Sequence, residues 1–152
     1  MPTHYTITEV EDKVIAALAE QMASYIKTCK SYQGEFDSQE EIQKLLLLSP
    51  AALVIFKGRD SKSLTPHGHA HVRTMTFTVY LVARDLRGEA TARTKAESGV
   101  YAMIEDCDAA LLDEKLDMDI PTPIRGGDVD IVIATKTMVV FAVRYQVDIY
   151  KV

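Results

Sequence analysis

Apolar residues recur at every third or fourth position near the start of the chain, with polar residues between them. The members of this stripe are Val10, Val14, Leu18, Met22, Tyr25 and Cys29. Such spacing places them on one side of an α-helix. Thr8 stands at a cap position and Glu11 follows it by three residues, the spacing of a capping box. We therefore expect a helix of about 20 residues that begins at Thr8.

Two shorter elements follow this helix. The segment 31–36 breaks the helical spacing, and its glycine lies between two aromatic residues, which favours a short extended segment. Ser38 and Glu41 repeat the spacing of a capping box. The residue before a proline is pushed out of helical geometry, so Pro50 must follow the end of this second helix.

A fully apolar segment, 51–56, comes next. It has no polar face to turn to water, so we expect a central strand that is covered on both sides and ended by Lys57 and Gly58. The following segment, 72–84, alternates strictly instead, as expected for a strand with one face on the core. Its other face carries Thr74, Thr76 and Thr78, and this face is either solvated or in contact with a partner.

The last third of the chain predicts a long helix and two strands. Residues 91–112 place one apolar side on a helix, and that side consists of Ala96, Val100, Met103, Ile104, Cys107 and Leu111. Gly99 lies inside this helix and would allow close packing. Acidic, proline and glycine residues make 113–127 an irregular connection. The strands should be 129–134 and 137–150, the second with a continuous apolar face.

These elements predict the fold class. One helix, a short strand, a helix, two strands, a helix and two strands, without a linker or repeat, indicate a single α+β domain over residues 1–152. We expect a mixed, mostly antiparallel sheet with the helices on one face. The first twenty residues carry acids and lack a basic leader or a long apolar run, so we expect no signal peptide, no membrane span and a soluble protein.

The net charge indicates which class of partner to expect, and the cysteine spacing indicates whether a disulfide is expected. The formal net charge is −5 with a pI of about 5.3. Phosphate binding depends on clustered lysine and arginine, so the chain is not expected to bind nucleic acid specifically, and protein partners are favoured. Cys29 and Cys107 are far apart, lie in predicted helices and lack paired spacing. They should be buried free thiols rather than a disulfide.

The segment His67-Gly68-His69-Ala70-His71 raises the question of a metal site, because alternation in a strand aligns imidazoles on one face. Gly68 makes the frame loose, however, and the segment belongs to a predicted loop at 58–70. We therefore expect a solvated or partner-contacting loop and no metal. A small metal-dependent enzyme built on His67, His69 and His71 remains the alternative.

Other catalytic patterns are weak. The sequence has no G-x-S-x-G nucleophile elbow and no phosphate-binding glycine pattern. The acidic residues between Glu105 and Asp119 are best interpreted as a solvated helix face and its following loop. We therefore expect no catalytic residues, no cofactor and no enzymatic activity.

Several segments together carry a family resemblance. They are the opening T-E-V-E-D helix, P-A-A-L-V-I-F-K-G at 50–58, V-A-R-D-L-R-G-E at 82–89, G-V-Y-A-M at 99–103 and Y-Q-V at 145–147. This arrangement resembles the Mu-like phage tail protein family, which is similar in size and element order to phage tail terminator proteins. The resemblance covers nearly the whole chain, and its motifs are structural rather than catalytic.

The resemblance implies an assembly role in the neck of a phage virion, after assembly in the host cytoplasm. Tail terminators form a ring, usually a hexamer, that caps the tail tube, ends its polymerisation and joins the tail to the head. The implied partners are further copies of the chain, tail tube and sheath proteins, and head-tail connector proteins, with DNA passing through the lumen without specific binding. Another head-tail connector or tail-completion protein is the alternative.

Candidate subunit contacts come from two places. Arg84, Arg87 and Arg93 surround a turn that also holds Glu89, and an arginine fork suits bidentate pairing with a neighbour's carboxylate. A solvated loop with weak surface pairs is the alternative interpretation. The second place is the face formed by Thr74, Thr76 and Thr78.

Overall fold

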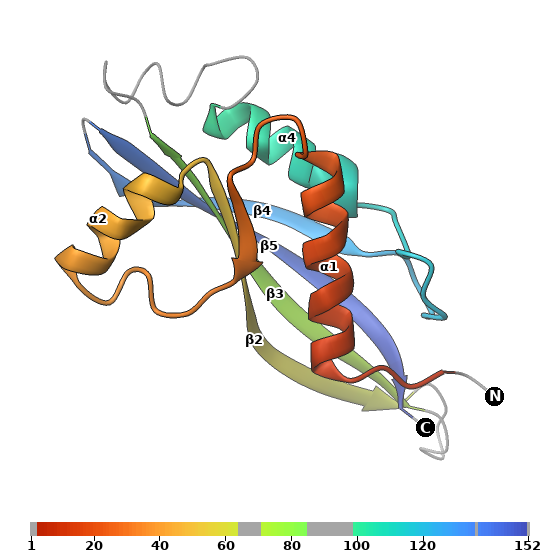
Figure 1. Cartoon of the computed structure of the whole chain (residues 1–152). Helices are drawn as coiled ribbons and strands as arrows, with labels where there is room; N and C mark the ends of the chain where they lie inside the picture. Colours follow the sequence, from red (N-terminus) through yellow and green to blue (C-terminus); the bar gives the residue numbers. More distant parts are fainter. Residues whose placement is uncertain (1–2, 64–70, 85–98, 136, 152) are drawn as a thin grey trace.

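The computed structural model describes residues 3–63, 71–84, 99–135 and 137–151 (Figure 1). The elements in this part of the chain are α1 (Ile7–Gln21), β1 (Thr28–Ser31), α2 (Gln39–Leu48), β2 (Ala51–Ser63), β3 (His71–Arg84), α4 (Val100–Leu111), β4 (Arg125–Ala134) and β5 (Met138–Lys151). Their order is the one that the sequence predicts. None of these helices is long and apolar enough to cross a membrane.

The strands form one five-stranded sheet in the order β1-β2-β3-β5-β4. β1 and β2 pair in parallel, and α2 makes the connection between them. The other three pairs are antiparallel, so β1 and β4 are the two edges of the sheet. The sheet is therefore mixed and mostly antiparallel, and the predicted α+β class is confirmed.

The main core lies between one face of the sheet, here called the helical face, and the helices α1 and α4. The described members of both predicted stripes are buried or half-buried there, as are the alternating apolar residues of β3 and β5. Ala96 of the second stripe lies outside the described residues. Burying a single large aliphatic or aromatic side chain contributes about 1.5–3 kcal/mol. The largest fully buried side chains on this face include Leu18, Met22, Phe77, Met103 and Tyr145.

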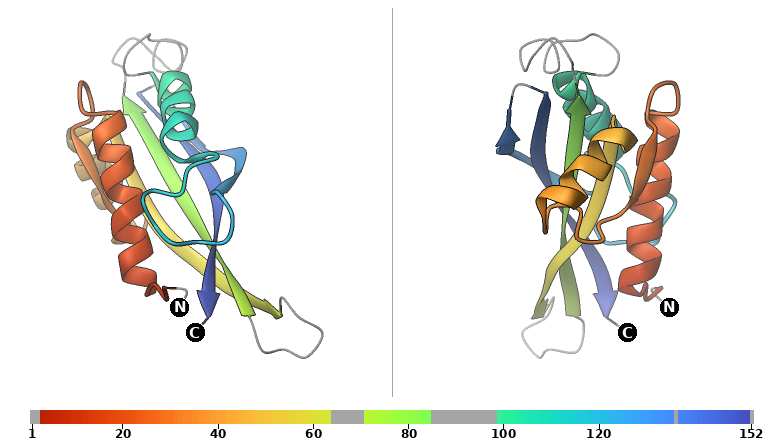
Figure 2. Two further views of the ribbon diagram at one scale, coloured as in Figure 1. Left: turned by 90° about the vertical axis from the view of Figure 1, so that its right-hand side faces the viewer. Right: turned by 60° about the vertical axis from the view of Figure 1, so that its left-hand side comes forward.

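The third helix, α2, packs on the opposite face of the sheet, here called the threonine face. In the left view of Figure 2, α1 and α4 lie in front of the strands and α2 lies behind them. Leu45 of α2 is fully buried against Ala51, Leu53, Val82 and Val140. The arrangement thus differs from the expectation of helices on one face only. The reason is that residues 51–54 are apolar on both sides of β2, so both sides need cover.

The start of α1 lies two residues earlier than predicted. Thr6, not Thr8, is the N-cap: the Glu9 N–H donates to Thr6 Oγ1 at 3.1 Å, and the Thr6 N–H donates to Glu9 Oε2 at 2.6 Å. Thr8 and Glu11 have the same spacing, but they lie inside the helix. The prediction of a capping box at the start of this helix is therefore confirmed, but the pair that forms it is Thr6 and Glu9 rather than Thr8 and Glu11. For α2 the predicted cap is confirmed, because the Ser38 side chain accepts from the Glu41 N–H.

The end of α1 was also predicted wrongly. The helix stops at Gln21, and Cys29 lies in β1 rather than in a helix. Tyr25 and Cys29 nevertheless pack against the main core. Their spacing thus reflects burial beside α1, reached through a turn and a strand, and not continuation of the helix. The short extended segment predicted at 31–36 lies a few residues earlier, as β1.

Two further boundaries differ from the predictions. Lys57 and Gly58 do not end β2, because a bulge between Phe56 and Gly58 absorbs an extra residue and pairing with β3 continues to Ser63. The predicted loop therefore loses its first residues to a strand. Gly99 does not lie inside a helix but is the N-cap of α4. The earlier part of the predicted helix, 91–98, lies outside the described residues.

The first and last described segments lie close together. The ring nitrogen Nδ1 of His4 is 3.1 Å from the carbonyl oxygen of Tyr150 in β5. Asp119, in the connection between α4 and β4, holds the same segment from the other side: its side chain accepts from the Thr3 N–H, and its N–H donates to the Tyr5 hydroxyl. Figure 1 shows both ends of the chain at the same end of the sheet.

Candidate functional site

The threonine face is only partly covered by α2. Thr74, Thr76 and Thr78 of β3 lie opposite Asp148, Gln146 and Arg144 of β5, on the side away from α1 and α4. Thr78 is buried, whereas Thr74 and Thr76 are half-buried. The face predicted to be solvated or in contact with a partner is thus a recessed polar surface.

A shallow depression of about 440 Å³ lies on this face. Its lining residues are Lys57, Thr76, Thr78, Tyr80, Asp130, Val132, Ala142 and Arg144. Arg144 Nη2 donates to Asp130 Oδ2 at 2.6 Å, and both side chains are more than half exposed. An exposed ion pair of this kind contributes only about 0–1 kcal/mol. The depression therefore presents hydroxyl groups and charges of both signs, which would suit contact with a polar surface of another molecule.

A buried carboxylate anchors one end of the threonine face. Asp148 of β5 accepts hydrogen bonds from Thr74 Oγ1 at 2.6 Å, Thr122 Oγ1 at 3.0 Å and Arg125 Nη1 at 2.5 Å. These donors come from β3, from the connection before β4 and from the first residue of β4. Asp148 therefore ties an edge strand to the middle of the sheet, a structural role rather than a catalytic one.

The same contacts set the pKa of Asp148. Burial raises it, because the charged form loses its water, but hydrogen bonds from Arg125, Thr74 and Thr122 and the charge of Arg125 act in the opposite direction. The donors prevail, so the pKa lies below its usual value. Asp148 is consequently ionised at neutral pH, with its charge matched inside the fold.

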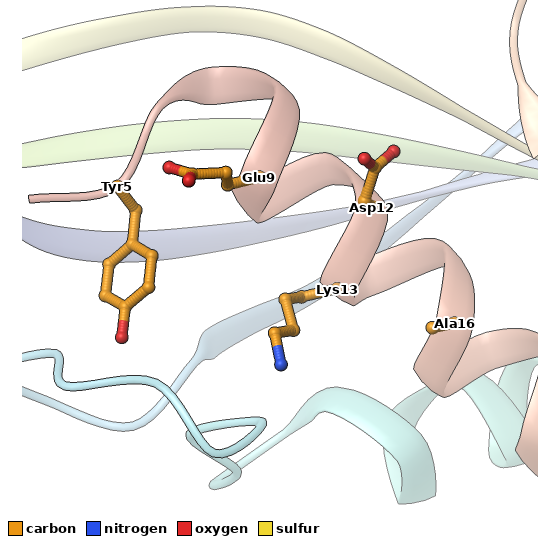
Figure 3. Close-up of a pocket in the computed structure, with 5 residues that line it drawn as sticks. All are labelled: Tyr5, Glu9, Asp12, Lys13 and Ala16. Atoms are coloured by element: carbon orange, nitrogen blue, oxygen red, sulfur yellow. The ribbon is translucent and has the colours of Figure 1, made fainter.

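A second depression, of about 430 Å³, lies at the start of α1 and is lined by Tyr5, Glu9, Asp12, Lys13 and Ala16 (Figure 3). Tyr5 and Lys13 point toward the connection after α4, whereas Asp12 points the other way. Glu9 and Tyr5 already have partners in the helix cap and in the connection. Hydrogen bonds from the backbone and side chain of Thr6 hold the pKa of Glu9 below its usual value. Glu9 and Tyr5 therefore stabilise the start of α1.

The two cysteines are free thiols in the described structure, and the prediction that they are buried holds for Cys107 alone. Cys107 is buried in α4, and burial raises its pKa well above the usual value. Cys29 is half-buried, its Sγ donates to the Ile15 carbonyl at 3.6 Å, and burial raises its pKa to about 11. Both side chains are protonated at neutral pH, so neither is a poised nucleophile.

The residues predicted from the sequence fall partly outside the structure. Arg84 is exposed at the end of β3, opposite Met138 of β5. Arg87, Glu89 and Arg93 lie outside the described residues. The predicted arginine cluster is therefore not tested by the described residues, and its role as a subunit contact stays a prediction.

The histidine segment is also mostly outside the described part. His71 is the first residue of β3, whereas His67 and His69 lie in the gap between 63 and 71. Among the residues that the structure places, no three histidine, cysteine, aspartate or glutamate side chains are grouped to hold a metal ion.

Sequence reasoning missed a set of exposed apolar residues at the β4 edge. Val129, Ile131 and Val132 are all exposed, although alternation in a strand normally buries one side. Beside them, Tyr101 of α4 is exposed and packs edge-on against Phe141 of β5, with ring centroids 6.1 Å apart. The available signal was the run Asp128-Val-Asp-Ile, in which acids alternate with branched apolar residues.

Comparison with known proteins gives one positive finding. A family model described as "Bacteriophage Mu, Gp37" matches residues 6–149 of the chain. This range runs from the N-cap of α1 to a position near the end of β5. A search of curated proteins gave no match.

Proposed function

Because the chain belongs to the Bacteriophage Mu, Gp37 family, we propose that this phage structural protein is a tail terminator: a six-fold ring that caps the finished tail tube and joins it to the head. The family match over residues 6–149 carries the proposal, since it covers nearly all of the helices and strands. The described surface supports it, because it offers recessed polar and apolar areas rather than an assembled catalytic group.

A ring of identical subunits needs two different contact patches on each copy. The chain has an accessible surface of 8137 Å². At about 800 Å² per patch, the two contacts would cover about a fifth of that surface. The threonine face, the β4 edge and the end of β3 at Arg84 are available for such contacts and for adjoining virion proteins.

The partners of the ring follow from its place in the tail. One side meets the tail tube and sheath proteins, the other side meets head-tail connector proteins, and DNA passes through the lumen. The net charge of −5 suits this passage, because a strongly basic lumen would hold phosphate groups through salt-sensitive contacts.

Electron microscopy of phage particles that lack this protein tests the proposal. A missing terminator leaves tube polymerisation unchecked, so tails of uncontrolled length are expected. Expression of the full chain in the same host should restore tails of uniform length, which controls for effects on neighbouring genes. Tails of normal length that stay unattached to heads would instead indicate a connector and contradict the proposal.

A further inference from the structure

The β4 strand is an unusual edge. Most of its ten residues are exposed, and Ile131 remains 54% exposed although it lies on the helical face opposite Phe141. Proteins normally protect an edge strand with charged residues, proline, β-bulges or a covering segment, because its free N–H and C=O groups can pair with another strand. β4 contains neither lysine nor proline.

Two irregularities limit the part of β4 that can pair. Register shifts lie between Gly126 and Asp128 and between Ile131 and Ile133. The regular stretch between them is Asp128–Ile131, which is four residues long. The opposite edge of the sheet, β1 at Thr28–Ser31, is also four residues long. The two free edges therefore match in length.

The two edges also differ in charge. The regular stretch of β4 carries Asp128 and Asp130, and Asp128 forms no ion pair with a described residue. The β1 edge carries Lys30, which already pairs with the buried Glu35 at 3.2 Å, and the exposed Lys27 comes directly before β1. Opposite charges across paired strands stabilise the pair, whereas like charges directly opposite destabilise it. A β4 edge is therefore complementary to β1 and repels a second β4.

Strand direction favours the same pairing. Following the pairings across the sheet, β4 runs antiparallel to β1. Copies related by rotation about an axis along the strands keep their strand directions. The β4 strand of one copy then meets β1 of the next copy in antiparallel orientation, which is the commoner strand pairing. The contact joins two different patches, so it generates a ring, provided that the rotation between copies closes, rather than a two-fold pair.

We propose that the β4 edge at Asp128–Ile131 docks on the β1 edge at Lys27–Ser31 of a second copy of this chain, so that the sheets continue from subunit to subunit. The inference rests on the proposed ring and names the surfaces that close it. Val129 and Ile131 supply apolar area to the contact, and the lysine and aspartate side chains set its orientation.

Charge exchange tests the contact in the full chain. The antiparallel orientation places Asp130, rather than Asp128, at the Lys27 end of β1. Lys27→Glu and Asp130→Lys each place like charges at that end, and each should weaken subunit association about tenfold or more, as native mass spectrometry and light scattering would measure. The double variant should restore the wild-type ring. Lys13→Glu, on the exposed side of α1, is the matched control and should leave association unchanged. Thermal melting by circular dichroism verifies that every variant folds.

Mixing two variants tests whether the contact is head-to-tail. Ile131→Asp weakens the β4 edge and Lys27→Glu weakens the β1 edge, so each variant alone should stay mostly monomeric at a concentration just above the wild-type dissociation constant. Their mixture has one functional contact and should give dimers and nothing larger. If Lys27→Glu keeps full association while Ile131→Asp loses it, β4 binds another surface and the inference is wrong.

Two remaining outcomes separate the inference from the proposed function. A wild-type ring that persists in every edge variant contradicts the edge contact and leaves the terminator role standing. A wild-type chain that stays monomeric up to about millimolar concentration, where even contacts of about −4 kcal/mol form, contradicts the proposed ring itself.

Discussion

Asp148 shows how one side chain can hold a polar face together. Its carboxylate is 5% exposed and accepts from three donors on separate segments. A buried charge is costly unless it is both paired and hydrogen-bonded, and Asp148 is both. The sequence shows this residue only as a single acid between Val147 and Ile149, because its donors are distant along the chain.

We predict that Asp148→Asn lowers the free energy of unfolding by about 1–3 kcal/mol at neutral pH. The reason is that the NH₂ group of asparagine would face hydrogen-bond donors where a carboxylate oxygen now accepts from them. The difference from wild type should depend on pH. A pKa that folding lowers adds stability above the unfolded-state value near 3.8, and this stability is lost as pH falls through the lower folded-state pKa.

Urea denaturation between neutral pH and about pH 3 measures this dependence. Asp130→Asn is the matched control, because it removes an exposed partner of Arg144 and should change stability by less than about 0.5 kcal/mol. An Asp148→Asn protein as stable as wild type at neutral pH would contradict the anchoring role.

At the scale of elements, the cap of α1 gives a sharp comparison between two threonines. Thr6 closes the capping box, whereas Thr8 lies exposed in the first turn. We predict that Thr6→Ala lowers the free energy of unfolding by about 1 kcal/mol, because the first-turn N–H of Glu9 loses its acceptor. Thr8→Ala should change it by less than about 0.5 kcal/mol. Chemical denaturation measures both, and a larger loss for Thr8→Ala would place the cap where the sequence pattern alone put it.

The elements themselves were largely predictable from the sequence. Their order, the buried stripes of α1 and α4 and the core faces of β3 and β5 are confirmed, because burial imposes a period that the sequence displays directly. The boundaries were less predictable. The bulge at Gly58 and the turn after Gln21 depend on how the strands pair, and strand pairing joins residues that are far apart in the sequence.

The candidate site was less predictable than the fold. The threonine face was visible from alternation in β3, but the depression also needs Lys57, Asp130 and Arg144 from three other positions in the sheet. The exposed β4 edge was not foreseen, because a strand's place at an edge depends on the final strand order. Contacts between subunits leave even less trace in one sequence, since their partner is outside the folded chain.

At the scale of the whole molecule, the threonine face is a candidate for contact with other virion proteins. We predict that Thr76→Glu keeps the fold but reduces incorporation into phage tails, because Thr76 is half-buried in the depression and a larger charged side chain would fill it. Ala16→Glu, on the exposed side of α1, is the control and should be incorporated normally. Immunoblotting of purified particles measures incorporation, and equal incorporation of both variants would exclude this face from the virion contacts.

The contact between His4 and Tyr150 has a practical consequence for imaging. A peptide label fused at either end of the chain would emerge from the same pole of each subunit. In a closed assembly, all such labels would decorate one rim. Antibody or gold particles bound there would show in a micrograph which rim faces the capsid.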